Sequence, residues 1–284
     1  MVHSTWGDWL VHSEIEATDP DGVSLWFLGC NGFVVRSPGA TVYVDPYFGD
    51  GDPPRVVRMI PVPMDSTDAT KCDAVLATHE HVDHMHPPSY GPLVNDLGAE
   101  LHAPAAAYTN PEYDGSMRVP EDRGNHVEPG DAIDVGDLTV HVRGAHDPDS
   151  AEPVSYVFEH DAGTVFHGGD TKPADAFGAI GEEFDIDAGI LAFGTRGNIA
   201  AADRVRRVSW YMNADQVIEV ANALQIDRLL PTHYDMWNGV DGDRKILFET
   251  ARSHRYPKRI DPIRVGDRVD LGEPGITLPQ SLSE

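Results

Sequence analysis

The stretch "ATHEHVDHMH", residues 77–86, places four histidines and two acids directly after the apolar run "DAVL". The apolar run predicts a buried strand, and a tight loop behind a strand can turn alternate side chains to one side. Within the stretch, His79, His81, Asp83 and His84 form the pattern H-x-H-x-D-H. Imidazole and carboxylate groups are metal ligands. We therefore expect the first two histidines to bind one divalent ion, and Asp83 with His84 to reach a second.

Ten residues cannot complete such a site, because a catalytic ion takes about three protein ligands and keeps a further position open. Three other candidates each follow a predicted strand: His146 after "LTVHV", Asp170 in "FHGGD" and His233 in "LLPTH". Sheets of α/β proteins present functional loops at the carboxyl ends of their strands, so we expect these residues to join the cluster. His141 competes with His146 but lies within its strand pattern. His167 fits a buried strand position better than an outer contact to the site.

Short apolar or alternating runs bounded by Gly, Pro and Asp recur along the chain and predict strands. The expected strands lie at residues 23–28, 33–36, 41–45, 73–78, 138–142, 188–193 and 227–233, with a hairpin over 155–170. Residues 213–225 and 242–252 have the periodicity of amphipathic helices. No repeat or linker divides the chain, so we predict one domain over residues 1–284 with an α/β fold, a four-layer αββα sandwich.

The composition is strongly acidic, with a formal net charge of −26 and only four lysines among 21 basic residues. The acids are spread along the chain, which favours a solvated, halophilic-type surface over a patch for a basic partner. We expect no nucleic-acid partner, because phosphate backbones are bound by lysine and arginine surfaces. No run approaches the ~20 apolar residues of a membrane span, and the first residues lack the pattern of a secretory signal. A cytoplasmic protein without a membrane partner is therefore expected.

The two cysteines, Cys30 and Cys72, are too few for a disulfide framework and lack the spacing of a metal site. Any metal ligands are therefore expected among His, Asp and Glu. Cys30 is expected to be packed rather than catalytic, since nothing near it in the sequence would make it a thiolate.

The cluster followed by His146, Asp170 and His233 resembles the ligand pattern of the metallo-β-lactamase superfamily. The resemblance implies the fold of that superfamily and metal-dependent hydrolysis. It also implies a dinuclear site, in which the first ion is held by His79, His81 and His146, the second by Asp83, His84 and His233, and Asp170 bridges the two.

A closer similarity lies outside the metal motif. The segments "WGDWL", "WFLGCNGFVVRSPGATVYVD" and "MNADQVIEVANALQIDRLLPTHYDMWN" resemble the L-ascorbate-6-phosphate lactonase family, in patches from Trp6 to Asn238. Residues 48–71 and the tail after Asp243 show no match. The family often lacks a histidine at the position of His146 and reads His-His-Asp where this chain has "HYD", residues 233–235. The fuller ligand set is typical of an ordinary dinuclear hydrolase.

The ligand types predict Zn²⁺ or Mn²⁺: the affinity order favours zinc, whereas the lactonase resemblance favours manganese. A water whose pKa the metal lowers to ~7 would attack the carbonyl of a lactone. Asp83 is the best proton acceptor of the set, and Asp170 is the second catalytic carboxylate. For a phosphorylated small-molecule substrate, Arg196 and Lys172 are candidate phosphate contacts, with surface ion pairs as the alternative. Tyr234 is a candidate pocket residue.

Other functions are compatible with the same candidate ligands. A phosphodiesterase would use the same dinuclear site, and a non-catalytic metal-binding protein would hold metal without turnover. A nucleic-acid-processing enzyme would need a basic surface that the sequence lacks. Sandwiches of this kind often pair, so a homo-oligomer is possible, although no sequence feature fixes it.

Overall fold

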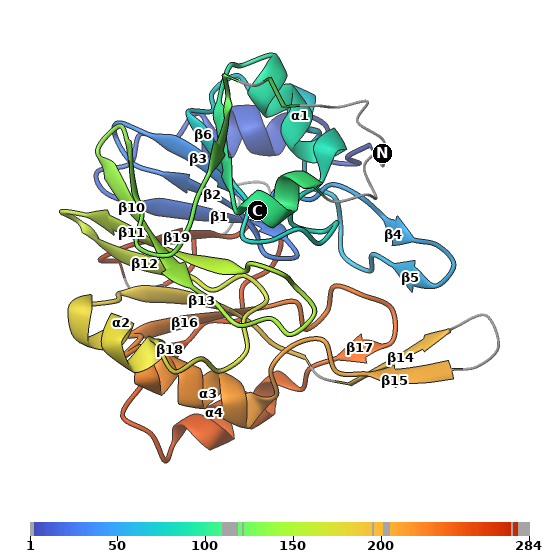
Figure 1. The fold of residues 1–284 in the computed structure, drawn as a ribbon, viewed down its shortest axis with the longest axis vertical. Coiled ribbons are helices and arrows are strands. Elements are labelled where there is room, and N and C mark those ends of the chain that lie inside the picture. Colours follow the sequence, from blue (N-terminus) through green and yellow to red (C-terminus); the bar gives the residue numbers. More distant parts are fainter. Residues whose placement is uncertain are drawn as a thin grey trace.

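Two seven-stranded sheets lie face to face, with helices on both outer surfaces (Figure 1). The computed structural model describes residues 3–109, 119–120, 122–194, 196–200, 205–273 and 275–277, and only the backbone of residues 196–200, 205–208 and 241. The arrangement confirms the α/β class and the αββα layer order expected from the sequence. The seven expected strands and both expected helices also agree with observed elements to within two residues at each end.

The first sheet is antiparallel at one side and parallel at the other. Its strands, in order across the sheet, are β19 (Arg268–Asp270), β1 (Ser24–Gly29), β2 (Gly32–Arg36), β3 (Thr41–Val44), β6 (Ala74–Leu76), β7 (Glu100–Ala103) and β8 (Gly124–His126). The second sheet is mixed in the same way. Its order is β18 (Arg259–Ile260), β16 (Arg228–Thr232), β13 (Ala188–Ala192), β12 (Gly163–His167), β11 (Val154–His160), β10 (Leu138–Gly144) and β9 (Ala132–Val135).

Helices cover the outer face of each sheet. The first sheet is covered by η1 (Leu10–Ile15), η2 (Ser66–Asp68), α1 (Pro87–Asn95) and η3 (Ala105–Thr109), and the second by α2 (Phe177–Glu183), α3 (Ala214–Ala223) and α4 (Arg244–Ala251). At the start of α3, the side chain of Asn213 accepts a hydrogen bond from Gln216 N, and the Gln216 side chain accepts one from Asn213 N. This reciprocal pair satisfies two backbone donors that the first helical turn leaves open.

The hydrophobic core has three layers because the strands are buried on both faces. In β1, Leu25 and Phe27 point between the two sheets, whereas Trp26 and Leu28 point toward η1 and α1. Successive side chains of a strand alternate between faces, so one buried strand supplies two layers of core. A third layer lies between the second sheet and its helices, where Phe166 packs edge-on against Phe177. None of the described helices is long and apolar enough to cross a membrane.

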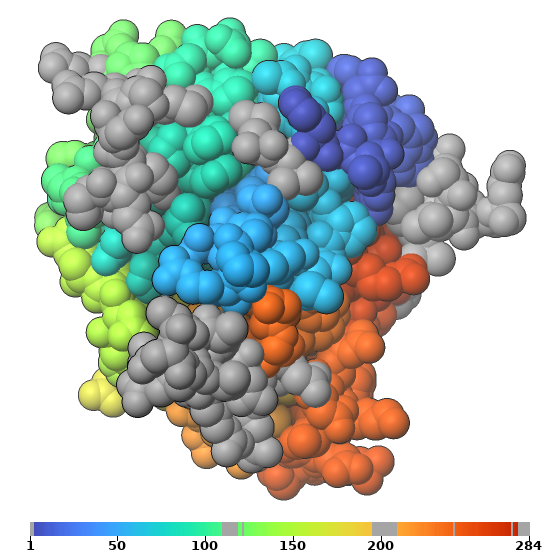
Figure 2. Space-filling model, turned by 90° about the vertical axis from the view of Figure 1, so that its right-hand side faces the viewer, coloured from blue at the N-terminus to red at the C-terminus, as the bar shows by residue number. Residues whose placement is uncertain are grey.

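Two small sheets extend beyond one end of the sandwich (Figure 1). One consists of β4 (Gly51–Asp52) and β5 (Val56–Val57), and the other of β15 (Val205–Val208), β14 (Arg196–Ala200) and β17 (Val240–Asp241). Figure 2 shows the segment with β4 and β5, in cyan, against the orange segment that contains β17. Met59 N donates to Met236 O at 2.8 Å, and Asn238 N donates to Val57 O at 3.0 Å. The two halves of the chain therefore meet at this end.

We expect the acidic charge to make stability strongly dependent on salt. Raising KCl from about 0.1 M to about 1 M shortens the Debye length from ~10 Å to ~3 Å, which weakens repulsion within a chain of net charge −26. The melting temperature should rise by at least about 2–4 °C, the shift that ~1 kcal/mol produces in a protein of this size. Thermal unfolding followed by circular dichroism at several KCl concentrations measures it. A constant or falling melting temperature contradicts the prediction.

Candidate metal centre

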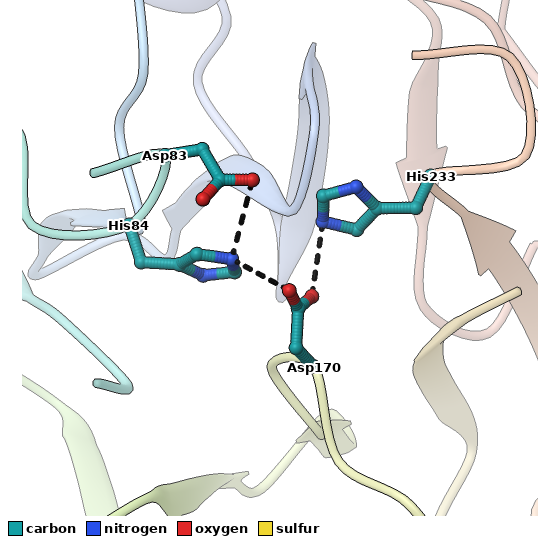
Figure 3. A group of neighbouring side chains, drawn as sticks. All are labelled: Asp83, His84, Asp170 and His233. Atoms are coloured by element: carbon teal, nitrogen blue, oxygen red, sulfur yellow. Dashed lines mark ion pairs between the residues drawn. The ribbon is translucent and has the colours of Figure 1, made fainter. Parts of the chain in front are cut away.

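Four of the candidate ligands meet where loops from the two sheets converge (Figure 3). Asp83 and His84 lie in the loop after β6, Asp170 follows β12, and His233 follows β16. All four side chains are buried and offer ligand atoms that lie within 4.8 Å of one another. Asp170 lies between the two imidazoles, with Oδ2 3.2 Å from His84 Nε2 and Oδ1 3.0 Å from His233 Nε2.

A second group of ligand atoms shares the same aspartate. His79, His81 and Asp170 also lie within 4.8 Å of one another, and His79 Nε2 is 2.9 Å from His81 Nδ1. Burial lowers the pKa of His79 well below its usual range, which favours the neutral imidazole that binds metal. Because Asp170 belongs to both groups, its carboxylate would be shared if each group held an ion.

The loop after β6 is fixed by Asp45, a buried residue that directly follows β3. Its carboxylate accepts hydrogen bonds from Thr78 N and Thr78 Oγ1, both at 2.8 Å, and lies 2.7 Å from His84 Nδ1. The contact to Nδ1 directs the opposite ring nitrogen, Nε2, toward Asp170. Burial alone would raise the pKa of Asp45, but the neighbouring His84 lowers it below the usual value. Asp45 is therefore held as a carboxylate that orients this imidazole.

Asp170 is positioned by the turn between β1 and β2. Asn31 Nδ2 donates to Asp170 Oδ1 at 2.9 Å, and Asn31 Oδ1 accepts a hydrogen bond from Thr232 Oγ1. His167 Nε2 lies 2.8 Å from the backbone oxygen of Asn31, so this strand histidine is buried and faces the turn rather than the ligand atoms. Gly169 has φ of +57°, and a Cβ there would lie 2.8 Å from Thr78 Oγ1. Glycine is thus required for the close approach of the two loops.

The charges of the cluster fit a divalent cation. His84 Nε2 and His233 Nε2 are buried, and each faces an oxygen of the Asp170 carboxylate, at 3.2 Å and 3.0 Å. Burial alone would lower the pKa of His84, but the carboxylates around it, Asp170 above all, raise it well above the usual range. Burial would raise the pKa of Asp170, and His233 with His84 lowers it instead. The cluster therefore favours positive charge at its centre, and its nitrogen and oxygen donors suit Zn²⁺ or Mn²⁺.

The structure does not bring His146 into the cluster. This residue is exposed, and its Nδ1 lies 3.0 Å from the backbone oxygen of Pro173. The next residue, Asp147, is buried, and its Oδ2 lies 3.8 Å from His79 Nε2 and 3.6 Å from His81 Nδ1. The difference from the sequence expectation is a shift by one residue in a loop, where no strand periodicity fixes which side chain points inward.

Three residues are expected to contact substrate, and the structure describes the side chains of two of them. Tyr234 is buried in the outer core of the second sheet, and its hydroxyl donates to Ile263 O at 3.0 Å, so it faces away from the cluster. Lys172 is half-buried, and its backbone nitrogen donates to His146 O at 2.6 Å. Arg196 begins β14, and its side chain lies outside the described part of the structure.

Cys30 and His141, which the sequence analysis did not assign to the site, have different surroundings. Cys30 is fully buried, and its Sγ donates to Asp83 Oδ2 at 3.3 Å and lies 4.0 Å from His233 Nδ1. Burial, reinforced by the charge of Asp83, raises the pKa of the thiol well above its usual value, so Cys30 stays protonated. His141 instead pairs with Glu159 on the neighbouring strand, at 2.9 Å.

A cavity of about 650 Å³ opens beside the ligands. Its wall includes His81, Asp83, Asp147 and Asp170 and continues over the β4–β5 hairpin and three aromatic side chains, Trp210, Tyr211 and Trp237. The Tyr211 ring stacks on His233 with centroids 4.2 Å apart, and Trp237 Nε1 donates to the Tyr211 hydroxyl at 2.9 Å. A cavity of this size next to a polar cluster suits a small molecule.

Sequence reasoning missed Asp45, Asn31, Asp147 and Tyr211 as parts of the site. The sequence offers a reason to consider Asp45 and Asn31, since each is a polar residue that follows an apolar strand. Asp147 directly follows His146, which fits the expected ligand pattern. Tyr211 lies in a segment without a motif. Their roles depend on contacts between residues far apart in the sequence, for example 22 positions between Tyr211 and His233 and 139 positions between Asn31 and Asp170.

Comparison with known proteins gives this site a family context. Residues 40–234 match the family described as "Beta-lactamase superfamily domain". The chain is 26% identical to the probable L-ascorbate-6-phosphate lactonase UlaG of Escherichia fergusonii, over 87% of this chain and 80% of that protein.

Solved structures share the fold at lower identity. Igni18, a metallo hydrolase from the archaeon Ignicoccus hospitalis, has a TM-score of 0.64 at 18% identity, covering 87% of this chain and 97% of its own. The metallo-β-lactamase fold protein YhfI of Bacillus subtilis has a TM-score of 0.59 at 17% identity, covering 88% and 99%.

Proposed function

Since the chain belongs to the metallo-β-lactamase superfamily, we propose that this metal-dependent hydrolase is a lactonase, which opens the cyclic ester of a sugar-acid lactone. The observation that carries the proposal is the similarity to a probable L-ascorbate-6-phosphate lactonase over 87% of the chain. The cavity beside the His and Asp cluster supports it, because its volume of about 650 Å³ accommodates a molecule of that size.

The residues that would hold metal are those of the two ligand groups: His79, His81, Asp83, His84, Asp170 and His233. A divalent ion supplies Lewis-acid polarisation of a carbonyl and lowers the pKa of a bound water. Imidazole nitrogens suit zinc, and carboxylate oxygens suit manganese. We propose Mn²⁺ or Zn²⁺ as the cofactor on this mixed donor set.

The chain's own groups would orient the reaction. Asp83 lines the cavity and accepts a hydrogen bond from the Cys30 thiol, so its carboxylate is directed and available to take up a proton. Asn31 holds one oxygen of Asp170, which keeps that carboxylate in place between the imidazoles. Trp210 and Trp237 contribute apolar surface to the cavity wall, against which a bound ester would pack.

We propose L-ascorbate 6-phosphate as the first substrate to examine, with unphosphorylated sugar lactones as the matched alternative. Among the cavity residues that the structure describes, the charged side chains are Asp and Glu, including Asp52 and Asp149, and none is Lys or Arg. A phosphate group would therefore depend on Arg196 of β14 or on Lys172. An unphosphorylated lactone would need no such cationic contact.

The experiment compares hydrolysis of L-ascorbate 6-phosphate, L-gulono-1,4-lactone and bis(p-nitrophenyl) phosphate by protein kept in high salt and reconstituted separately with Mn²⁺ and Zn²⁺. We expect turnover of at least one lactone and its loss on metal removal, because the bound ion would supply the polarisation of the carbonyl. Turnover of the phosphodiester alone would replace the lactonase with a phosphodiesterase. Metal-loaded protein that turns over none of the three would contradict the proposal.

A further inference from the structure

The loop after β10 approaches the His79 and His81 pair with a carboxylate instead of an imidazole. Asp147 Oδ2 lies 3.6 Å from His81 Nδ1 and 3.8 Å from His79 Nε2, and only 8% of the residue is exposed. The same side chain lines the cavity. His146 lies at the surface with Nδ1 3.0 Å from Pro173 O, a contact on the outer side of the loop.

The backbone around His146 is held on both sides. His146 N donates to Thr171 Oγ1 at 3.0 Å, and His146 O accepts from Lys172 N at 2.6 Å. Both partners directly follow Asp170, so the loop is attached to the segment that carries the shared ligand. The backbone of His146 is thus held in place, and its ring would have to leave Pro173 O to turn toward the cluster.

The side chain of Asp147 is oriented by its own turn. Its Oδ1 accepts a hydrogen bond from Asp149 N at 3.2 Å, and its backbone oxygen accepts one from Ser150 N at 3.1 Å. This local turn uses one carboxylate oxygen and leaves Oδ2 directed at the two histidines. A buried carboxylate oxygen that faces two imidazole nitrogens has the donor chemistry of a metal ligand.

We propose that Asp147, and not His146, is the third protein ligand of the ion held by His79 and His81. With the shared Asp170, this ion then has two imidazoles and two carboxylates around it. The exchange of an imidazole for a carboxylate adds negative charge and a hard oxygen donor, which favours Mn²⁺ more than the arrangement with His146 does. Metal binding by Asp147 does not depend on whether the substrate is a lactone.

The test uses Asp147→Ala and His146→Ala as a matched pair of neighbouring variants. Each full-length protein is stripped with chelator and titrated with Mn²⁺ in the absence of substrate, and bound metal is counted by mass spectrometry and calorimetry. We expect Asp147→Ala to lower the affinity for one of two Mn²⁺ ions by at least about 10–100-fold. Losses of this size are seen even for residues that only support metal ligands. His146→Ala should change neither affinity by more than about twofold, the usual limit for a surface substitution.

Circular dichroism and thermal unfolding of the metal-free proteins show whether both variants fold. Should Asp147→Ala fail to fold, Asp147→Asn keeps an acceptor for Asp149 N and removes the carboxylate charge, and the same ion should again bind more weakly. Loss of an ion in His146→Ala alone overturns the proposal, as do equal losses in the two variants or no loss in either. Because no substrate is present, failure here is distinct from failure of the lactonase assignment.

Discussion

We expect Asp170→Ala to lower kcat/KM by roughly 10³-fold or more and to release metal from both ligand groups. Asp170 is the one residue common to the two groups, and its two oxygens lie 3.0 Å from His233 Nε2 and 3.2 Å from His84 Nε2. Its removal leaves both imidazoles without the carboxylate between them. The loss should exceed the ~10²–10³-fold that follows removal of one oxyanion donor, because metal binding and catalysis fail together.

Steady-state kinetics on the lactone that the proposed comparison shows to be turned over, together with metal analysis of the purified variant, measure the effect. Asp175→Ala is the matched control, since Asp175 is an exposed acid in the same loop region and should leave both quantities unchanged. Full metal content in Asp170→Ala, with activity within tenfold of the parent, would show that this carboxylate does not bridge the groups.

The largest effect on stability is expected for Asp45→Ala. Asp45 and His84 are both fully buried and 2.7 Å apart, and Asp45 also accepts two hydrogen bonds from Thr78. Removing one partner of a buried charged pair costs about 3–5 kcal/mol, since the other partner is left without compensation. Metal affinity should fall about 10–100-fold as well, because the orientation of His84 is lost.

Urea unfolding at constant high salt gives the free-energy change, and titration with Mn²⁺ gives the affinity. Asp45→Asn should lose less stability than Asp45→Ala, because its amide oxygen still accepts from Thr78. Asp161→Ala removes an exposed acid at the β11–β12 turn and should change stability by less than about 0.5 kcal/mol. Equal stability of Asp45→Ala and this control would disprove a structural role for the buried pair.

The sequence predicts the sheets well because their strands are apolar runs bounded by turn residues. Runs such as 188–193 and 227–233 coincide with β13 and β16, whose burial on both faces favours apolar or small residues; Arg228, at the start of β16, is the exception and pairs with Asp261. The candidate ligands in the loops after β6, β12 and β16 are predictable for the same reason, because each loop follows a strand that the sequence predicts. Local pattern thus specifies where the site lies.

The sequence does not predict helix α1, because its segment "PPSYGPLVN" contains three prolines and a glycine. Two of the prolines occupy the first helical positions, where the missing N–H costs nothing. Its buried face, including Tyr90 and Leu93, packs in the outer core of the first sheet, and this tertiary contact outweighs weak propensity. The sequence likewise does not predict that the His146 side chain lies at the surface, because the backbone of this residue is held by Thr171 and Lys172 in another loop.

The order of the ligands along the chain has a consequence for the newly made protein. The rings of His84 and His233 lie 5.8 Å apart, yet roughly 150 residues separate them in sequence. At about 5–20 residues per second, a ribosome needs roughly 7–30 s to add that stretch. During this interval the early histidines are present without Asp170 or His233, so a nascent chain has only a partial site. Tight metal uptake should therefore be among the last steps of its maturation, after most of the second sheet has been synthesised.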